Sequence, residues 1–97
     1  MKYVISERAK IDLAEIWYYS QTKWGIKQAD KYLDQFYETF DFLTRNPKLG
    51  KQTLSKAYNY LRYRCEKHYI FYTIENDQKI NIIRILHTKM NFVDHLE

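Results

Sequence analysis

This 97-residue sequence is poor in the residues on which several common architectures depend. A single cysteine, Cys65, excludes an internal disulfide and favours a reducing compartment. Two glycines cannot supply the glycine-rich loop that cradles phosphate groups. No apolar run approaches the roughly 20 residues that cross a bilayer. The apolar segment at residues 3–5 is also too short for a signal peptide. We therefore expect a cytoplasmic protein with no membrane partner.

What the sequence does contain is typical of one folded domain spanning residues 1–97. Hydrophobic residues make up 45% of the chain, and ten tyrosines predict many rings at the boundary between core and water. The net charge is +4 and the isoelectric point is about 9.1. A basic chain of this kind favours an anionic partner, either nucleic acid or an acidic protein.

The first half of the sequence predicts a short strand followed by two helices. The strand covers residues 2–5, and Ser6 can cap a helix over residues 7–22. Helical spacing places several residues of this segment on one side, Trp24 among them: Ala9, Leu13, Ile16, Trp17, Ser20 and Trp24. Gly25 ends this helix. A second helix begins near Ile26 with a continuous apolar stripe and ends before Pro47, so the two helices form an antiparallel hairpin.

The second half predicts a basic loop and three strands. We expect residues 46–58 to be loop, because they are polar and lack an apolar alternation. From Tyr60 the period changes to two, and further strands are expected over residues 68–74 and 79–86. The last of these is apolar on both faces and should be central. One helical turn is expected within residues 91–96.

These elements predict an α+β fold. An N-terminal strand precedes the helical hairpin, and the hairpin covers one face of a small antiparallel sheet. The other face is expected to stay open and to carry the side chains that alternate outward.

No cofactor is expected, and no metal site. Cys65 and His68 have a Cys-x-x-His spacing, but a zinc site needs more ligands, and His87 and His95 are far along the chain. Residues three apart on a continuous strand also point to opposite faces. No motif presents Ser or Cys beside a base as a nucleophile.

Basic residues in the predicted strands are the strongest candidates for a site. Cleavage of RNA through its 2′-hydroxyl needs a base, an acid, and a cation that stabilises the phosphorane. Arg84 has the chemistry of the cation and His87 that of the acid or base. Strand geometry argues against a shared site, because residues 84 and 87 point to the same face only if the strand ends or bulges between them. The alternative, equally open, is an ion-paired Arg84 and a His87 packed at the sheet edge.

The order of several short motifs resembles the RelE/ParE superfamily of toxins from type II toxin–antitoxin systems, and the ParE side in particular. The motifs in chain order are Asp12-Leu13 with Glu15-Ile16-Trp17, Trp24-Gly25 with Gln28-Ala29, Asn46-Pro47 with Gly50, Leu61-Arg62, His68 with Ile70-Phe71-Tyr72, and Arg84 to His87. One departure is Asn91, where the family often has Asp after Met.

The resemblance implies a toxin that is neutralised by a cognate, ParD-like antitoxin in a hetero-oligomeric complex. ParE-like members are associated with inhibition of DNA gyrase, without catalysis of their own. RelE-like members instead cleave mRNA on the ribosome. A third alternative is a non-toxic module that only binds its antitoxin.

The residues that follow the last predicted strand favour the ParE side. RelE-like enzymes often keep a tyrosine where this chain has Met90 and Phe92, so a full acid–base set is not assembled. On this reading no catalytic residue is expected, whereas the RelE reading would use Arg62, Arg84 and His87. The residues expected to bind the target are Arg62, Arg84, His87, Lys89, Met90 and Phe92. Trp17 and Trp24 are expected to receive the antitoxin.

Overall fold

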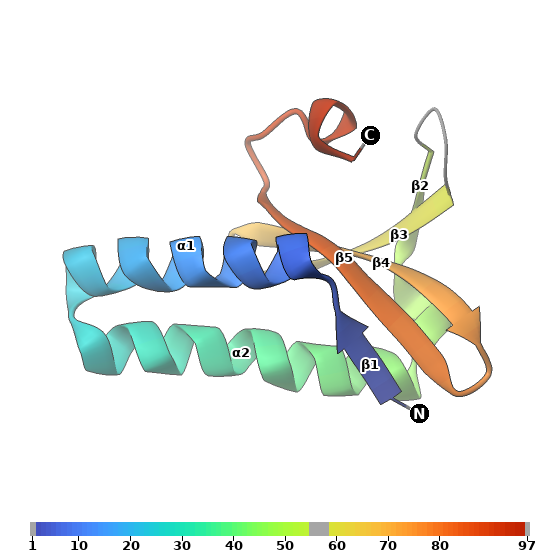
Figure 1. Ribbon diagram of the computed structural model, residues 1–97, viewed down its shortest axis with the longest axis horizontal. Coiled ribbons are helices and arrows are strands. Elements are labelled where there is room, and N and C mark those ends of the chain that lie inside the picture. Colours follow the sequence, from blue (N-terminus) through green and yellow to red (C-terminus); the bar gives the residue numbers. More distant parts are fainter. Residues whose placement is uncertain (1, 55–58, 97) are drawn as a thin grey trace.

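The computed structural model describes residues 2–54 and 59–96, and it has two helices packed on a five-stranded sheet (Figure 1). The α+β prediction is confirmed. The elements in chain order are β1 (Lys2–Ile5), α1 (Glu7–Trp24), α2 (Ile26–Arg45), the 3₁₀ turn η1 (Pro47–Leu49), β2 (Lys51–Leu54), β3 (Asn59–Cys65), β4 (His68–Asn76), β5 (Lys79–His87) and the 3₁₀ turn η2 (Phe92–His95).

The helix boundaries follow from their caps. The Ser6 hydroxyl accepts a hydrogen bond from the Ala9 amide at 3.0 Å and donates to the Ile83 carbonyl at 2.8 Å, so it caps α1 and ties it to β5. The helix runs to Trp24, two residues beyond the predicted end. Gly25 then takes a φ of 90°, a conformation that other residues rarely adopt, and α2 starts at once.

The strand order is β1-β5-β4-β3-β2. The β3–β4 and β4–β5 pairings are antiparallel, as predicted. The unpredicted strand β2 is antiparallel to β3, and β1 pairs with β5 in parallel, with Ile5 opposite Ile82. The parallel pairing is possible because the whole helical hairpin and three further strands separate β1 from β5 in sequence. β5 therefore has neighbours on both sides, as its apolar sequence predicts.

The prediction of a loop over residues 46–58 is wrong for its first part. Residues 47–49 form η1 and residues 51–54 form the edge strand β2, while residues 55–58 lie outside the described residues. The β2 strand lies at an edge, and of Lys51, Gln52 and Thr53 only Thr53 is buried. The strand conformation of β2 therefore comes from its pairing with β3, and its sequence shows no alternation of apolar residues that would predict it.

The Asn46–Gly50 segment is fixed by one buried tyrosine. The Tyr72 hydroxyl donates to the Pro47 carbonyl at 2.7 Å and accepts from the Gly50 amide at 2.9 Å. A side chain at position 50 would lie 2.9 Å from the Leu61 Cβ, so only glycine fits there. Burial raises the pKa of Tyr72.

The main core lies between the helices and the sheet. The predicted stripe of α2 is confirmed, with Ala29, Phe36, Phe40 and Leu43 buried. On α1 the stripe holds for Ala9, Leu13 and Ser20, but Trp24 is 56% exposed because it lies at the end of the hairpin.

The opposite face of the sheet is not fully open, contrary to expectation. A second cluster of Tyr60, Phe71 and Leu86 is covered by Phe92 and Leu96. These two residues come from the C-terminal segment, residues 88–96, which follows β5. Figure 1 shows this segment, in red, returning from the end of β5 over the sheet, away from α2. The Tyr60 hydroxyl donates to the Leu96 carbonyl at 3.2 Å.

Candidate functional site

A groove of about 530 Å³ lies between α1 and the end of the sheet where β5 leads into the C-terminal segment. One wall is α1 and includes Asp12 and Trp24. The other wall is the β3–β4 turn, the end of β5 and the segment after it. Cationic and anionic side chains both line this groove, among them Arg8, Lys23, Lys67, Asp12, Glu15 and Glu66.

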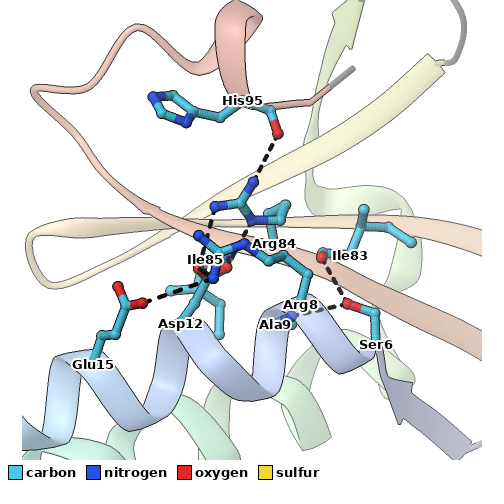
Figure 2. A network of polar contacts seen from close by, with 9 residues as sticks. All are labelled: Ser6, Arg8, Ala9, Asp12, Glu15, Ile83, Arg84, Ile85 and His95. Carbon is cyan, nitrogen blue, oxygen red and sulfur yellow. Dashed lines mark hydrogen bonds and ion pairs between the residues drawn. The ribbon is translucent and has the colours of Figure 1, made fainter.

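Arg84 lies in the groove within a network of polar contacts (Figure 2). Its Nε and Nη2 donate to the two carboxylate oxygens of Asp12 at 2.9 and 3.2 Å, and its Nη1 donates to the His95 carbonyl at 2.8 Å. The exposed fractions of the two side chains are 11% for Arg84 and 5% for Asp12. Every nitrogen of this guanidinium therefore has a partner within the chain.

Asp12 also completes the hydrogen bonding of β5. Its Oδ2 accepts from the Ile85 amide at 3.0 Å, at a point of β5 that lies beyond the pairing with β1. Arg8, one turn earlier on α1, places its guanidinium 3.4 Å from Oδ1. A buried carboxylate with these partners joins α1 to β5 and offsets the cost of its own burial.

Arg84 and His87 line the same groove although they lie on opposite faces of β5. Phe71 of β4 is opposite Arg84, but the next residue, Tyr72, is opposite Ile82, so the register shifts at Ile83. This bulge precedes Arg84, so the alternation from Arg84 to His87 is regular. Arg84 is in the row of Phe71, on the face of the second cluster, and His87 is opposite His68, on the helix-covered face. The objection from strand alternation therefore holds, and both residues line the groove because it lies along β5 beyond the end of its pairing with β1.

His87 stands beside a second imidazole, His68, directly across the β4–β5 pair. The two ring centroids are 5.2 Å apart, and His68 Nδ1 lies 3.3 Å from the Tyr32 hydroxyl. Burial, and secondarily the charge of His87, lower the pKa of His68 to about 4. His68 is therefore neutral at pH 7. His87 Nδ1 accepts from the Lys89 amide at 3.1 Å, which places the proton of the neutral ring on Nε2.

Arg62 lies on the face of the sheet that carries the second cluster, in the same cross-strand row as Phe71 and Arg84. Its guanidinium stacks on the rings of Tyr69 and Phe92, with its central carbon 5.5 and 5.3 Å from their centroids. It also donates to the Thr53 hydroxyl. The residues of the RelE reading are thus divided: Arg62 and Arg84 lie on the face of the second cluster and contact the C-terminal segment, and His87 lies on the helix-covered face.

The remaining predicted target-binding residues follow β5. Lys89 and Met90 are exposed, and Met90 lines the edge of the groove. Phe92 is half-buried in the second cluster. Val93, which the sequence did not single out, is 40% exposed on the same segment.

The two tryptophans have different environments. The Trp17 indole donates to the Asp30 carboxylate at 2.8 Å and so joins α1 to α2. Trp24 is exposed at the rim of the groove, and its ring meets Tyr19 edge to face at 6.4 Å between centroids. Of the two, Trp24 has the surface to offer a partner.

Two residues of this groove were missed by the sequence reasoning. Asp12 is an acidic residue three positions after Ala9 and four before Ile16, within the apolar side of α1, and that position is the signal of a buried partner. His68 was considered only as a zinc ligand. The argument from a continuous strand was wrong there, because Cys65 and His68 are directly opposite each other across the β3–β4 turn.

No group of three His, Cys, Asp or Glu side chains within residues 2–54 and 59–96 is arranged to hold a metal ion. Cys65 belongs to the main core, where burial raises its pKa. In the same described ranges, neither helix is long and apolar enough to cross a membrane.

Comparison with known proteins identifies the class. Residues 3–92 match a family model described as the ParE toxin of type II toxin-antitoxin system, parDE. Toxin ParE1 of Caulobacter vibrioides is 35% identical over 94 residues, covering 97% of this chain and 96% of that protein. Toxin ParE1 of Mycobacterium tuberculosis is 29% identical, with 93% and 92% covered, and Toxin ParE of Escherichia coli is 27% identical, with 97% and 91% covered.

The fold is also that of a solved toxin–antitoxin protein. A chain of the chromosomal ParDE TA system from P. aeruginosa superposes with a TM-score of 0.77 at 19% identity, covering 92% of this chain and 97% of that one. The protein is therefore a toxin of the type II toxin–antitoxin class. Within that class, it belongs to the ParE family. The resemblance drawn from the sequence motifs is confirmed.

Proposed function

We propose that this protein inhibits DNA gyrase by binding it through the C-terminal segment, without catalysis, and that a cognate ParD-like antitoxin neutralises it. The target-binding surface comprises the exposed part of residues 89–95, where Met90 and Val93 are 39% and 40% exposed. Exposed apolar side chains next to Lys89 and His95 suit a protein target that also holds DNA. Both partners place the protein in the cytoplasm.

The observation that carries this proposal is the engagement of Arg84. A nuclease needs a cation that is free to stabilise the charge developing on the phosphorane. Arg84 instead faces the carboxylate of Asp12, and its third nitrogen is occupied by the His95 carbonyl. The nearest negative charge to this guanidinium belongs to the protein itself, which opposes binding of a phosphate there.

The division of the basic residues supports the same choice. Arg62 and His87 lie on different faces of the sheet, so they cannot act on one scissile phosphate without rearrangement. His68 is neutral and enclosed by Tyr32 and Phe36, with its ring centroid 5.6 Å from that of Phe36. The ribosome-dependent nuclease is the second candidate because the rings of His68 and His87 have centroids 5.2 Å apart, and a pair of imidazoles can supply acid–base chemistry.

The antitoxin is proposed to occupy the groove and to contact Trp24 at its rim. The groove combines aromatic walls with charges of both signs, which suits an amphipathic peptide segment. Trp17 contributes indirectly, by fixing α1 against α2 through Asp30.

The test is plasmid supercoiling by purified gyrase with increasing amounts of this protein. We expect inhibition with accumulation of linear DNA, and a clearly weaker effect from Val93→Asp, which puts a charge on the exposed segment. Tyr18→Asp is the matched control, because Tyr18 is 67% exposed on α1, away from the C-terminal segment. Cleavage of mRNA on ribosomes by the parent protein, lost in His87→Ala, with supercoiling unaffected, would instead establish the nuclease.

A further inference from the structure

The C-terminal segment is attached to the sheet by two arginines that approach it from different strands. Arg84 of β5 donates its Nη1 to the His95 carbonyl at 2.8 Å. Arg62 of β3 stacks on Phe92, with 5.3 Å between its central carbon and the ring centroid. Phe71 of β4 stands between them in the register, opposite both Arg62 and Arg84. One row across three strands therefore meets the whole length of η2.

We infer that Arg62 and Arg84 are positioning residues: they hold residues 91–96 in one conformation, and the exposed side of that conformation is what the target binds. This inference rests on the proposed function and changes the role expected of both arginines. Neither guanidinium is then a contact to gyrase. Each acts through the segment it holds, which presents Val93 outward and Phe92 and Leu96 inward, next to the exposed Met90.

The segment needs such attachment because it has little structure of its own. Apart from bonds within η2 itself, the backbone hydrogen bonds inside residues 88–96 are Asp94 to Asn91 at 3.2 Å and Leu96 to Phe92 at 3.1 Å. A turn this short is not stable in isolation. Its apolar anchors are Phe92 and Leu96, and only Leu96 is fully buried. Contacts from the sheet therefore decide whether the segment has one conformation or many.

The two contacts also use what arginine has and lysine lacks. Arg84 bonds the Asp12 carboxylate and the His95 carbonyl at the same time, through three nitrogens of one planar group. Arg62 stacks its plane on two rings while donating to Thr53. A lysine keeps the charge at either position, but its donors share one nitrogen and it has no planar group. It therefore loses the spread of donors that Arg84 uses and the stacking that Arg62 uses.

The experiment compares Arg62→Lys, Arg84→Lys and the double variant with the parent protein. Lysine at position 84 leaves a cation beside Asp12, and position 62 does not touch Asp12, so at least one variant tests the inference without disturbing the α1–β5 link. Arg64→Lys is the matched control, because Arg64 lies on the same strand as Arg62 and donates to the Glu66 carbonyl of its own hairpin at 2.9 Å.

The first measurement is amide hydrogen exchange of Asp94 and Leu96, with Ile70 and Tyr72 of β4 as internal references. We expect exchange at Asp94 and Leu96 to quicken roughly tenfold in each lysine variant, and further in the double variant, as loss of one charge-assisted contact implies. Exchange at the references should not change. Parent-like exchange at Asp94 and Leu96 in both single variants, or equal acceleration in Arg64→Lys, would overturn the inference.

The second measurement is the concentration that half-inhibits gyrase supercoiling. Inhibition should weaken in the order of the exchange rates, with thermal midpoints within about 2 °C of the parent for Arg62→Lys. Faster exchange with undiminished inhibition would overturn the positioning role. Failure of the proposed function is distinguishable, because the parent protein would then not inhibit gyrase, while the exchange rates still decide whether the arginines hold the segment.

Discussion

The two faces of the sheet are covered by very different amounts of chain. The helical hairpin covers one face with a cluster of eleven buried residues from both helices and three strands. The other face has a cluster of four buried residues, one of which, Leu96, comes from the C-terminal segment. Burial of apolar surface stabilises a fold roughly in proportion to its area. The helix-covered face therefore holds the domain together, and the other face is free to serve recognition.

The same contrast applies to the two arginines that meet the C-terminal segment. Arg84 is 11% exposed and paired with a buried carboxylate, so its removal would damage the fold. Arg62 is half-buried and stacks on rings at the surface, so its removal should leave the fold intact. A loss of toxicity at one position thus has a different meaning from a loss at the other.

The largest expected effect is a difference between the two clusters. Phe40→Ala removes a ring that is fully buried under the helices and should lower the free energy of unfolding by about 3–5 kcal/mol. Phe92→Ala removes a half-buried ring on the other face and should cost about 1 kcal/mol. Urea unfolding of the two variants measures both values. Equal losses would show that the two faces contribute alike.

The next effect concerns the link between α1 and β5. Asp12→Ala leaves Arg84 and the Ile85 amide without their partner and should cost about 3 kcal/mol. Glu15→Ala is the matched control on the same helix, since Glu15 is 69% exposed and 3.8 Å from Arg8. We expect the control to stay within about 0.5 kcal/mol of the parent. A stable Asp12→Ala protein would contradict the role given to this carboxylate.

Acid should destabilise the protein through His68. The unfolded chain binds a proton at this imidazole with a pKa of 6.5, whereas the folded pKa is about 4. A lowered histidine pKa means that stability is present above pH 6.5 and is lost as the pH falls toward 4. After discounting for solvent screening, the loss is about 1–2 kcal/mol. His68→Gln should flatten this part of the stability profile, and an unchanged slope in that variant would assign the loss to other groups.

The smallest effect is at the Asn46–Gly50 turn. Tyr72→Phe keeps the ring but removes the hydroxyl that contacts Pro47 and Gly50. Two hydrogen bonds are lost, so the free energy of unfolding should fall by about 1–2 kcal/mol. Thermal unfolding followed by circular dichroism measures the shift. An unaltered midpoint would indicate that water replaces the hydroxyl at no cost.

The helices were predictable because their signals are local. Ser6, Gly25 and Pro47 mark the ends, and the stripe of α2 recurs every three or four residues. The edge strand β2 was missed for the opposite reason, since its polar residues acquire a strand conformation only by pairing with β3. The parallel pairing of β1 with β5 is likewise a property of the assembled sheet.

The candidate site was predictable in its residues but not in its geometry. The sequence singled out Arg62, Arg84 and His87, yet it did not show that Arg62 and Arg84 lie in one cross-strand row while His87 lies on the opposite face. The partner of Arg84 is 72 residues away in sequence, on α1. Long-range pairs of this kind follow from the packing of α1 against β5, and a single sequence does not contain them explicitly.

The measurement that tests the central claim most directly is a hydrogen-exchange footprint of this protein bound to gyrase. The account predicts slower exchange over residues 89–96, with the helix-covered face and the α1 wall of the groove, beside Trp24, unchanged. Protection confined to α1 and the groove would place the target on the surface assigned to the antitoxin. No protection by gyrase anywhere in a folded sample would contradict the proposal that this face of the sheet binds that target.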